Sequence, residues 1–571
     1  MKQAISRAAA VPEILRQGTA HHQAGRLPEA EACYRQILAI DPHHADGLHL
    51  LGVIALQVGR CEQAVELIGH AIKRQPRLAH YHSNLGNAFA ALGRYEEAAT
   101  SCREARRLNP NFPTAHNNLA NVLQSLGRLD EAEASCRAAL TLNPAYPEAH
   151  NSLGYILHEA GRNAEAEMSC REALRLRPGF VEAHNNLGNA LRDLGHAAEA
   201  EASYATALAL RPDYVEAHYN RGNAFAALGQ LDAAERASRE ALRLRPDYVR
   251  CHIALGMHLL LAGRLDEGWP EYEWRWRSSS DGFTGPRDFA QPRWKGERLE
   301  GRVLLLHAEQ GFGDTLQFCR YASLAATRAG GRIVLEVPRP LARLTATLPG
   351  VDQVVVEGDA LPPFDLHCPL LSLPDIFGTT LDTIPALSPY LAADPAQTAR
   401  WRARLETLPG LRVGLVWAGN PRRSQPSATA IDRRRSLTLS HLAPLGGIDG
   451  ISFVSLQKGD GASQRIDLPT GMSLHDWTHE LHDFADTAAL IEGLDLVIGV
   501  DTAVIHLAGA LGKPIWLLNR FDTCWRWLLG RDDSPWYPSL RQFRQPRMGD
   551  WTSVLADVRI ALDRVANEGR R

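Results

Sequence analysis

A proline recurs every 34 residues through the first half of this 571-residue chain. Seven prolines keep that spacing without an insertion: Pro42, Pro76, Pro110, Pro144, Pro178, Pro212 and Pro246. A glycine keeps the same period from Gly25 to Gly263. Proline ends a helix, and glycine readily takes the positive φ of a tight turn. We therefore predict a helix–turn–helix unit that repeats along the chain and stacks into a solenoid.

Small residues occupy the positions at which the two helices of a unit should cross. In the first helix these are Gly52, Gly86, Gly154, Gly188 and Gly256; in the second they are Ala64, Ala98, Ala132, Ala166, Ala200 and Ala234. The pattern resembles the tetratricopeptide repeat over about residues 11–275. The repeats would start at 11, 45, 79, 113, 147, 181 and 215, with a degraded eighth at 249. Such an array presents a concave inner surface.

Asparagines line one face of the first helices. Asn84, Asn118, Asn186 and Asn220 share one repeat position, and a second row follows one helical turn later. Residues three apart lie on one helix face, so stacking predicts a double row of amides. Amides can donate to and accept from an extended peptide backbone, and the O-GlcNAc transferases carry a similar ladder. We predict binding of a protein or peptide acceptor; the alternative is that these asparagines cap or space the repeats.

Composition excludes several classes of protein. The net charge of −3 gives no nucleic-acid footprint. There is no 18-residue apolar run and no signal peptide, so we expect a cytoplasmic protein, with peripheral attachment to the inner membrane as an alternative. Nine cysteines occur without a CxxC pair, and Cys102, Cys136 and Cys170 share one repeat position. We expect them to be buried filler rather than metal ligands.

The periodicity changes after about residue 276. Residues 276–300 are rich in Ser, Gly, Pro and charge and are predicted to be a connector. Strands then alternate with helices, which implies parallel sheets with right-handed crossovers. The predicted strands are 302–308, 332–337, 351–358, 412–419, 451–457, 494–500 and 515–519; the predicted helices are 315–330, 339–348, 438–446, 484–493, 502–512 and 552–567. We predict two Rossmann-like halves, 301–395 and 396–571, with ligands at the carboxyl ends of the strands.

Two segments at such strand ends carry candidate chemistry. In HAEQGFGDT, Gly311 and Gly313 let the backbone approach a ligand, and Asp314 lies at a helix start. In GVDTAVIH, Asp501 and Thr502 begin a helix, and its free N–H groups and dipole favour a phosphate. His506 lies one turn further along the same helix.

These segments resemble known motifs. GVDTAVIHLAGALGKP looks like the signature of the heptosyltransferase-type glycosyltransferases (family 9-like), and GFGDTLQF resembles their first-strand loop. The resemblance implies a GT-B fold over about 301–571, with nucleotide sugar held mainly by the second half. It implies that Asp314 is the general base. The donor side would be lined by Gly311, Gly313, Asp501, Thr502 and His506.

Three further segments are candidates in the second half. The family has a basic residue after the first strand of this half, and Arg435 takes that place, with Arg434 close behind; the alternative is a solvated loop. Arginine would present a fork where lysine presents a point charge. Gln457 and Lys458 end a strand and are predicted to face the donor. Residues 525–527, Trp-Arg-Trp, would stack a base or sugar, or form a packed loop.

The predicted function is glycosyl transfer from a nucleotide diphosphate-sugar to a hydroxyl acceptor, on a protein that the repeats recruit. No DxD motif stands in a suitable place, so we expect no metal and no further cofactor; the resemblance implies an inverting outcome. The same combination of repeats and GT-B domain occurs in O-GlcNAc transferases. The first alternative is a heptosyltransferase-like enzyme acting on lipopolysaccharide or another glycan. The second is a non-enzymatic repeat scaffold with a degenerate GT-B domain.

Overall fold

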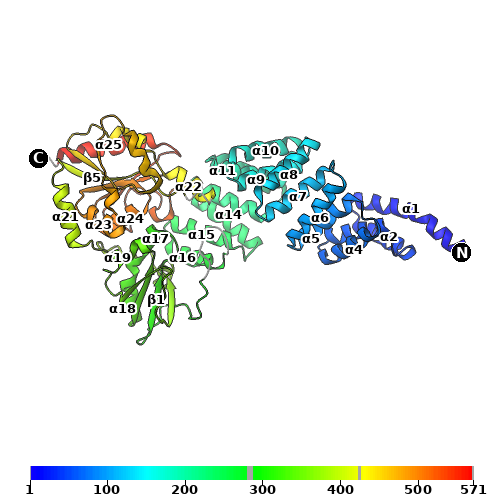
Figure 1. Ribbon diagram of the computed structural model, residues 1–571, viewed down its shortest axis with the longest axis horizontal. Helices are drawn as coiled ribbons and strands as arrows, with labels where there is room; N and C mark the ends of the chain where they lie inside the picture. The colour runs from blue at the N-terminus through cyan, green and yellow to red at the C-terminus, as the bar shows by residue number, and fades with distance from the viewer. Residues whose placement is uncertain (1, 279–286, 422–425, 569–571) are drawn as a thin grey trace. The chain divides into compact units, whose positions relative to one another are not determined.

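The computed structural model describes residues 2–278, 287–421 and 426–568 (Figure 1). Of the predicted connector 276–300, residues 279–286 therefore lie outside the described residues. The chain divides into two compact units, Met1–Pro212 and Asp213–Arg571. This division lies inside the stretch predicted to be repeats. Among the described helices, none has the length and apolar character needed to cross a membrane.

The first unit is built from paired helices. They are α1 (Lys2–Gln23), α2 (Leu27–Ile40), α3 (Ala45–Gln57), α4 (Cys61–Arg74), α5 (Ala79–Ala91), α6 (Tyr95–Leu108), α7 (Pro113–Ser125), α8 (Leu129–Leu142), α9 (Pro147–Glu159), α10 (Asn163–Leu176), α11 (Val181–Asp193) and α12 (Ala197–Leu210). From Ala45 onward each first helix begins at the predicted repeat start. Only α1 differs, because it begins at Lys2, well before residue 11.

The predicted turns and crossings are confirmed. All the periodic glycines from Gly25 to Gly263 have φ between 72° and 91°, the left-handed region that disfavours a side chain. At the crossings, a Cβ added to Gly86 would lie 2.4 Å from Sγ of Cys102, and the same holds for Gly154 and Cys170. Cys102, Cys136 and Cys170, which share one repeat position, are fully buried as expected, and burial raises the pKa of the Cys102 thiol to about 12.

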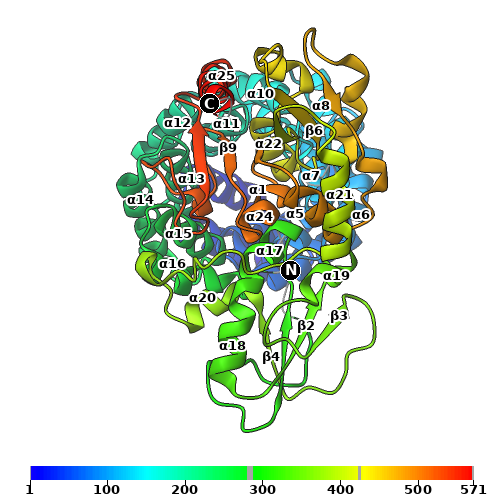
Figure 2. The same ribbon diagram turned by 90° about the vertical axis from the view of Figure 1, so that its left-hand side faces the viewer.

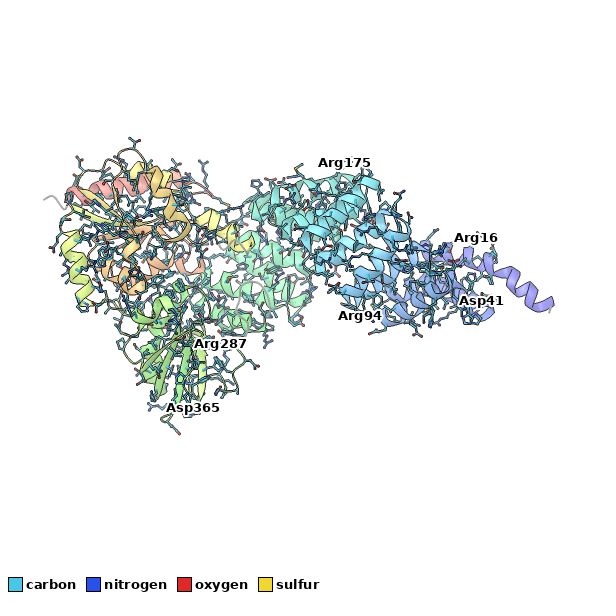
Figure 3. All side chains as sticks on the ribbon, viewed as in Figure 1. Arg16, Asp41, Arg94, Arg175, Arg287 and Asp365 are labelled. Atoms are coloured by element: carbon cyan, nitrogen blue, oxygen red, sulfur yellow. The ribbon has the colours of Figure 1, made fainter. Side chains whose placement is uncertain are left out.

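A histidine row links successive repeats. In the first helix of successive repeats, Nε2 of a histidine bonds the carbonyl of the proline that closes the preceding helix, at 2.8–2.9 Å. The pairs are His82–Pro76, His116–Pro110, His150–Pro144 and His184–Pro178 in the first unit and His252–Pro246 in the second. Exposed ion pairs such as Arg175–Glu172, at 2.7 Å, lie on the surface of the repeats (Figure 3). Each repeat is therefore held mainly by its neighbours.

The second unit begins with four more helices and a short 3-10 helix. These are α13 (Val215–Ala227), α14 (Leu231–Leu244), α15 (Val249–Leu261), α16 (Leu265–Tyr272) and η1 (Glu273–Arg277). A four-stranded parallel sheet follows, in the order β3-β2-β1-β4. Its strands are β1 (Val303–His307), β2 (Arg332–Val337), β3 (Gln353–Val356) and β4 (Leu366–Pro369). Its helices are α17 (Phe312–Phe318), η2 (Cys319–Tyr321), α18 (Ala322–Ala329), η3 (Arg339–Leu341), α19 (Ala342–Thr345), η4 (Leu370–Ser372), α20 (Leu373–Ile376) and η5 (Leu381–Thr383).

A second parallel sheet has the order β10-β9-β8-β5-β6-β7. Its strands are β5 (Leu411–Val416), β6 (Ile451–Ser455), β7 (Leu474–His475), β8 (Leu496–Val500), β9 (Ile515–Asn519) and β10 (Leu540–Arg544). Its helices are α21 (Pro395–Leu405), α22 (Pro426–Arg435), η6 (Leu439–Leu445), η7 (Gly459–Asp467), η8 (Thr478–Glu480), α23 (Phe484–Glu492), α24 (Ala503–Ala510), η9 (Trp525–Trp527) and α25 (Trp551–Glu568). Figure 2 shows α17 and α24 side by side between the two sheets. The α/β architecture predicted for this region is confirmed.

Some element predictions were wrong. The helix expected at 315–330 is broken into α17, η2 and α18, and the one expected at 438–446 is the 3-10 helix η6. Strands β4, β7 and β10 and helices α21 and α22 were missed. All three missed strands are edge strands that mix polar with apolar residues, so no long apolar run marks them.

One hydrophobic core joins the last repeat to both sheets. It contains Trp269 from α16, Leu304 from the first sheet, and Ile505 beside the second. Because these side chains share a core, α15 and α16 are part of the same compact unit as the two sheets. The end of the repeat array is therefore a structural part of the α/β region.

Candidate functional site

Asp314 caps α17 and is paired across the two halves. It is the third residue of the helix, and its Oδ2 accepts from the backbone N–H of Gly311 at 3.0 Å. Its Oδ1 accepts from Nη2 of Arg526, which lies in η9 after β9. Both side chains are largely buried, with 19% of Asp314 and 10% of Arg526 exposed. The predicted base is therefore held by a cation from the other half.

The start of α24 carries the second motif. Thr502 is the N-cap residue, and its buried Oγ1 has no hydrogen-bond partner among the described residues. Asp501 Oδ1 lies 3.7 Å from Nε2 of His506, whose Nδ1 is 2.9 Å from the hydroxyl of Tyr537. Burial alone would raise the pKa of Asp501, but His506 and the nearby arginines lower it far below its usual value. The carboxylate is thus ionised in the folded protein.

Arg435 stands beside this helix start. Its Nη1 donates to the backbone carbonyl of Asp501 at 3.1 Å, and its Nε donates to Asp432 at 2.9 Å. A Cβ at Gly419 would lie 2.3 Å from Nη2 of Arg435, so only glycine leaves room for the guanidinium there. Arg434 turns elsewhere and donates to Asp522 at 3.0 Å. Of the two predicted arginines, Arg435 is the one next to Asp501.

Gly313 sets the approach of the two motifs. A Cβ at this position would lie 2.8 Å from Cδ2 of His506 and 3.7 Å from Cα of Ala503. Gly311 is less constrained, because its Cβ would meet only Oδ2 of Asp314, at 3.4 Å. The contact at Gly313 brings the loop after β1 directly against α24, so both sequence motifs form one site.

Gln457 and Lys458 are engaged with the chain itself. The Oε1 of Gln457 accepts from the N–H groups of Trp417 and Ala418 at 2.9 and 2.8 Å. Its Nε2 donates to the carbonyls of Ala418 and Lys458 at 3.0 and 2.8 Å. The amide thus orders the ends of β5 and β6. Lys458 is exposed and its Nζ donates to the carbonyl of Leu481. Their donor contact stays a prediction.

The asparagine row bridges successive repeats. In three places the amide of the row bonds a residue 35 positions earlier, in the preceding first helix. The pairs are Asn84–His49 at 2.9 Å, Asn118–Ser83 at 3.0 Å and Asn186–Asn151 at 2.9 Å. Asn220 is 8% exposed. Each of these three amides thus uses one of its N–H groups to hold two repeats together, as the spacing alternative predicts. Peptide binding by the row stays a prediction.

The last repeat supports the loop that carries Asp314. Nε and Nη2 of Arg275 in η1 each donate to Glu309 at 3.0 Å, and Glu309 also accepts from the N–H of Leu371 at 3.0 Å. Only 2% of the Arg275 side chain and 4% of the Glu309 side chain are exposed. The next residue, Gln310, donates to the hydroxyl of Tyr272 at 3.0 Å. Sequence reasoning missed these contacts, because Arg275 and Glu309 lie 34 residues apart and no motif joins them.

The tryptophans around Arg526 are packed. Trp525 is 5% exposed and Trp527 is fully buried, so these rings match the packed-loop alternative. Trp527 stacks on His506, with ring centroids 5.2 Å apart. Trp525 packs edge-on against Trp269 of α16, with centroids 5.4 Å apart. The aromatic rings build the wall of the site, and Arg526 is the member of this trio that reaches Asp314.

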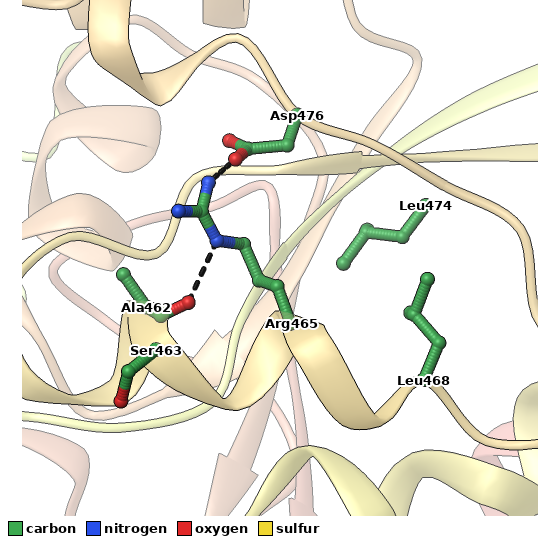
Figure 4. Close-up of a pocket in the computed structure, with 6 residues that line it drawn as sticks. All are labelled: Ala462, Ser463, Arg465, Leu468, Leu474 and Asp476. Atoms are coloured by element: carbon green, nitrogen blue, oxygen red, sulfur yellow. Dashed lines mark hydrogen bonds and ion pairs between the residues drawn. The ribbon is translucent and has the colours of Figure 1, made fainter.

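A separate hollow lies along η7 and β7, at the β6–β7 edge of the second sheet (Figure 4). It is lined by Ala462, Ser463, Arg465, Leu468, Leu474 and Asp476. Arg465 crosses it, donating to the carbonyl of Ala462 at 2.7 Å and pairing with Asp476. It contains none of the predicted site residues. In the described part of the chain, no group of three or more His, Cys, Asp or Glu side chains is placed to hold a metal ion.

Different known families match the helical repeats and the α/β region. Residues 219–273 match the family Tetratricopeptide repeat, and residues 3–221 match the Cilia and flagella-associated protein 70 C-terminal domain. The amino-terminal array is made of tetratricopeptide repeats. Residues 482–518, which contain β8, α24 and β9, match Glycosyltransferase family 9 (heptosyltransferase). The carboxyl-terminal region is therefore glycosyltransferase-like, and this match covers the Asp501–His506 motif.

Individual relatives cover parts of the chain. Protein FlbA of Caulobacter vibrioides is 32% identical over 323 residues, which are 52% of this chain and 52% of FlbA. The chain thus spans about half the length of this curated relative. Among solved structures, the Thermus thermophilus repeat protein TTC0263 is 26% identical to this chain, with a TM-score of 0.30. The match covers 32% of this chain and 99% of the TTC0263 chain. A chain of the APC/C hetero-tetramer Cut9–Hcn1 is 19% identical, with a TM-score of 0.39. The match covers 43% of this chain and 49% of that chain.

Proposed function

We propose that this chain transfers a sugar from a nucleotide diphosphate-sugar to a hydroxyl group of a protein that the repeats recruit. One observation carries the proposal. A carboxylate from the first half, Asp314, and a helix start flanked by Arg435 in the second half meet at the contact between Gly313 and His506. Such a pairing of base and anion site across two α/β halves is what glycosyl transfer requires.

The donor would be held at the start of α24. Its first N–H groups and helix dipole favour an anion, and the unpartnered hydroxyl of Thr502 adds a donor. Arg435 adds a fixed positive charge, anchored by Asp432 and the carbonyl of Asp501. Together these groups would stabilise the negative charge of the leaving diphosphate, and we propose that they do so without a metal ion.

Asp314 would act as general base. It would take the proton of the acceptor hydroxyl as the oxygen attacks the anomeric carbon, while the bond to the diphosphate breaks on the opposite face. This single displacement inverts the anomeric configuration. The capping bond from Gly311 keeps Oδ2 in place, so Oδ1, which accepts from Arg526 in this structure, is the oxygen that would meet the acceptor hydroxyl.

A protein acceptor is favoured over a free glycan by the tetratricopeptide repeats themselves, because such arrays present an extended surface to other proteins. The partly exposed amides of Asn84, Asn118 and Asn186 each keep further hydrogen-bonding capacity beyond the one bond between repeats. We propose that this capacity serves the acceptor backbone.

The test uses purified full-length protein with a panel of nucleoside diphosphates and their sugars. Thermal stabilisation by at least one nucleoside diphosphate, and slow hydrolysis of its sugar, are expected. Asp314→Asn should reduce transfer at least about 100-fold and keep nucleotide binding. Asp359→Asn, which alters an exposed carboxylate in the same half, is the matched control. A protein that binds none of the nucleotides would be the non-enzymatic scaffold.

The acceptor class is tested separately. Replacing Asn84, Asn118 and Asn186 by alanine together should weaken transfer to protein acceptors and spare transfer to water or a small alcohol. Because the three amides also bridge repeats, circular dichroism of the variant must show that the helices persist. Equal loss on both kinds of acceptor would favour the glycan alternative.

A further inference from the structure

Arg526 has a bonding pattern that an anion would complete. It is 9% exposed, and its buried Nε has no hydrogen-bond partner in the part of the chain described. Nη2 donates to Asp314, and Nη1 has a weak contact of 3.1 Å with Sγ of Cys524. A guanidinium carries five N–H donors, and leaving a buried donor unpaired is unfavourable. Arg526 therefore has a buried N–H donor that no acceptor satisfies in the described part of the structure.

The unpaired donors lie near the proposed diphosphate site. Asp314 follows Gly313, which contacts Ala503 and His506 at the beginning of α24. The positive charge of Arg526 also contributes to the lowered pKa of Asp501, although burial acts in the opposite direction. The free hydroxyl of Thr502 belongs to the same helix start. The segments that carry these two unpartnered donors thus meet at His506, which contacts Gly313 beside Asp314 and stacks on Trp527 beside Arg526.

Asp314 is engaged by two donors in this arrangement. Each of its oxygens accepts a hydrogen bond, one from Gly311 and a charge-assisted one from Arg526. A charge-assisted bond is about twice as strong as a neutral one, and it stabilises the charged carboxylate that a general base must give up when it takes a proton. Loosening the ion pair would therefore favour proton transfer to Asp314.

We propose that Arg526 exchanges Asp314 for the diphosphate of the donor, so that donor binding itself frees the base. This inference rests on the proposed function. In the donor complex the guanidinium bonds phosphate oxygens, and Asp314 accepts the proton of the acceptor hydroxyl. The acceptor oxygen then forms the bond to the anomeric carbon. The bonding pair of the broken C–O bond leaves with the nucleoside diphosphate, whose charge Arg526 neutralises.

The exchange is tested by a double-mutant cycle on nucleoside diphosphate affinity. Isothermal titration calorimetry with UDP, GDP, ADP, CDP and dTDP compares the full-length protein with Asp314→Asn, Arg526→Gln and the double variant. Asp314→Asn removes the cost of breaking the pair and should tighten binding at least about fivefold. Arg526→Gln should weaken binding about tenfold. In the Arg526→Gln background, Asp314→Asn should gain less than about twofold.

The cycle separates exchange from simple repulsion. Removing a negative charge near a phosphate would tighten binding equally in both backgrounds, and equal gains would overturn the inference. If the unaltered protein binds none of the five diphosphates, the proposed function fails first and this inference with it. Binding with equal gains defeats the inference alone. If Arg526→Gln does not fold, Arg526→Met takes its place in the cycle with the same expected values, because it removes the charge and keeps most of the apolar stem.

Discussion

Replacing Arg275 by methionine would remove the cation that ties the last repeat to the loop carrying Asp314. Methionine keeps most of the apolar stem, so the change acts mainly through charge and hydrogen bonds. Glu309 would lose both hydrogen bonds from Arg275 and keep the one from the N–H of Leu371, in a place where 4% of its side chain is exposed. Glu273, the other carboxylate bonded to Arg275, would still pair with Arg293 at 2.9 Å. The cost therefore falls on Glu309.

The size of the effect follows from this geometry. Two unit charges about 4 Å apart attract by about 4 kcal/mol at an effective dielectric constant near 20. Removing one partner of a buried pair typically costs about 3–5 kcal/mol, because the other charge stays buried. With an unfolding entropy of roughly 2 cal/mol/K per residue, a unit as large as Asp213–Arg571 should melt about 4–7 °C lower.

The deficit should also depend on pH. Burial already raises the pKa of Glu309, and Arg275 opposes that rise, so the variant raises it further. A carboxyl with a raised folded pKa favours folding below its unfolded pKa and loses that contribution as the pH rises through the folded pKa. The difference between the variant and the unaltered protein should therefore be smallest near pH 5 and grow toward pH 8.

Differential scanning calorimetry at pH 5 and pH 8 measures both effects. The matched control is Arg564→Met in α25, which breaks an exposed pair with Glu568 at 2.9 Å, with 81% and 63% of the two side chains exposed. That pair should contribute about 0–1 kcal/mol. If Arg275→Met costs no more than Arg564→Met, or costs the same at both pH values, the buried pair does not hold the loop as argued.

Two further predictions follow from the geometry. Gly313→Ala places a Cβ 2.8 Å from Cδ2 of His506 and should push α17 away from α24. Sugar transfer should then fall at least about tenfold, while nucleotide affinity stays within about threefold. Unchanged kinetics would show that this contact can relax without affecting transfer. In the first unit, burial would lower the pKa of His158, but its hydrogen bond with Asp193 raises that pKa to about 9. The stabilisation is present below the ordinary histidine pKa near 6.5 and is lost as the pH rises through 9, so the melting temperature of the repeats should fall over that window. Asp193→Asn should flatten the fall, and a fall that persists in that variant would assign it to another group.

The repeats were predictable because their information is local. The spacing of Gly25 and its equivalents encodes turns, and the small residues encode helix crossings within one unit or with its neighbour. The helix starts from Ala45 onward therefore follow from sequence alone. The same logic located β2 and β9 to the residue, because each is built around three or four consecutive apolar residues, Ile333–Leu335 and Ile515–Leu518. It failed for β4 and β10, where polar residues interrupt the pattern.

The candidate site divides in a similar way. The motifs predict Asp314, Asp501 and His506, because a strand followed by a sharp turn and a helix start can be recognised within about a dozen residues. Arg435 was chosen over Arg434 from its position alone, and the structure places it beside Asp501. The engagement of Gln457 with the backbone of Trp417 and Ala418 was not foreseen, because that pairing spans 40 residues between two strands.

The chain's own residue order thus establishes a periodic helical array, a parallel α/β region and the two motifs at its strand ends. These features depend on contacts within one repeat or one strand–helix unit. The sequence does not determine which of these side chains contact one another, because such contacts depend on how units distant in the sequence pack together. Arg526 and Asp314 are 212 residues apart, and Arg275 and Glu309 come from different kinds of structure. Packing between these distant segments brings the last repeat, Asp314 and the buried Arg526 into one site.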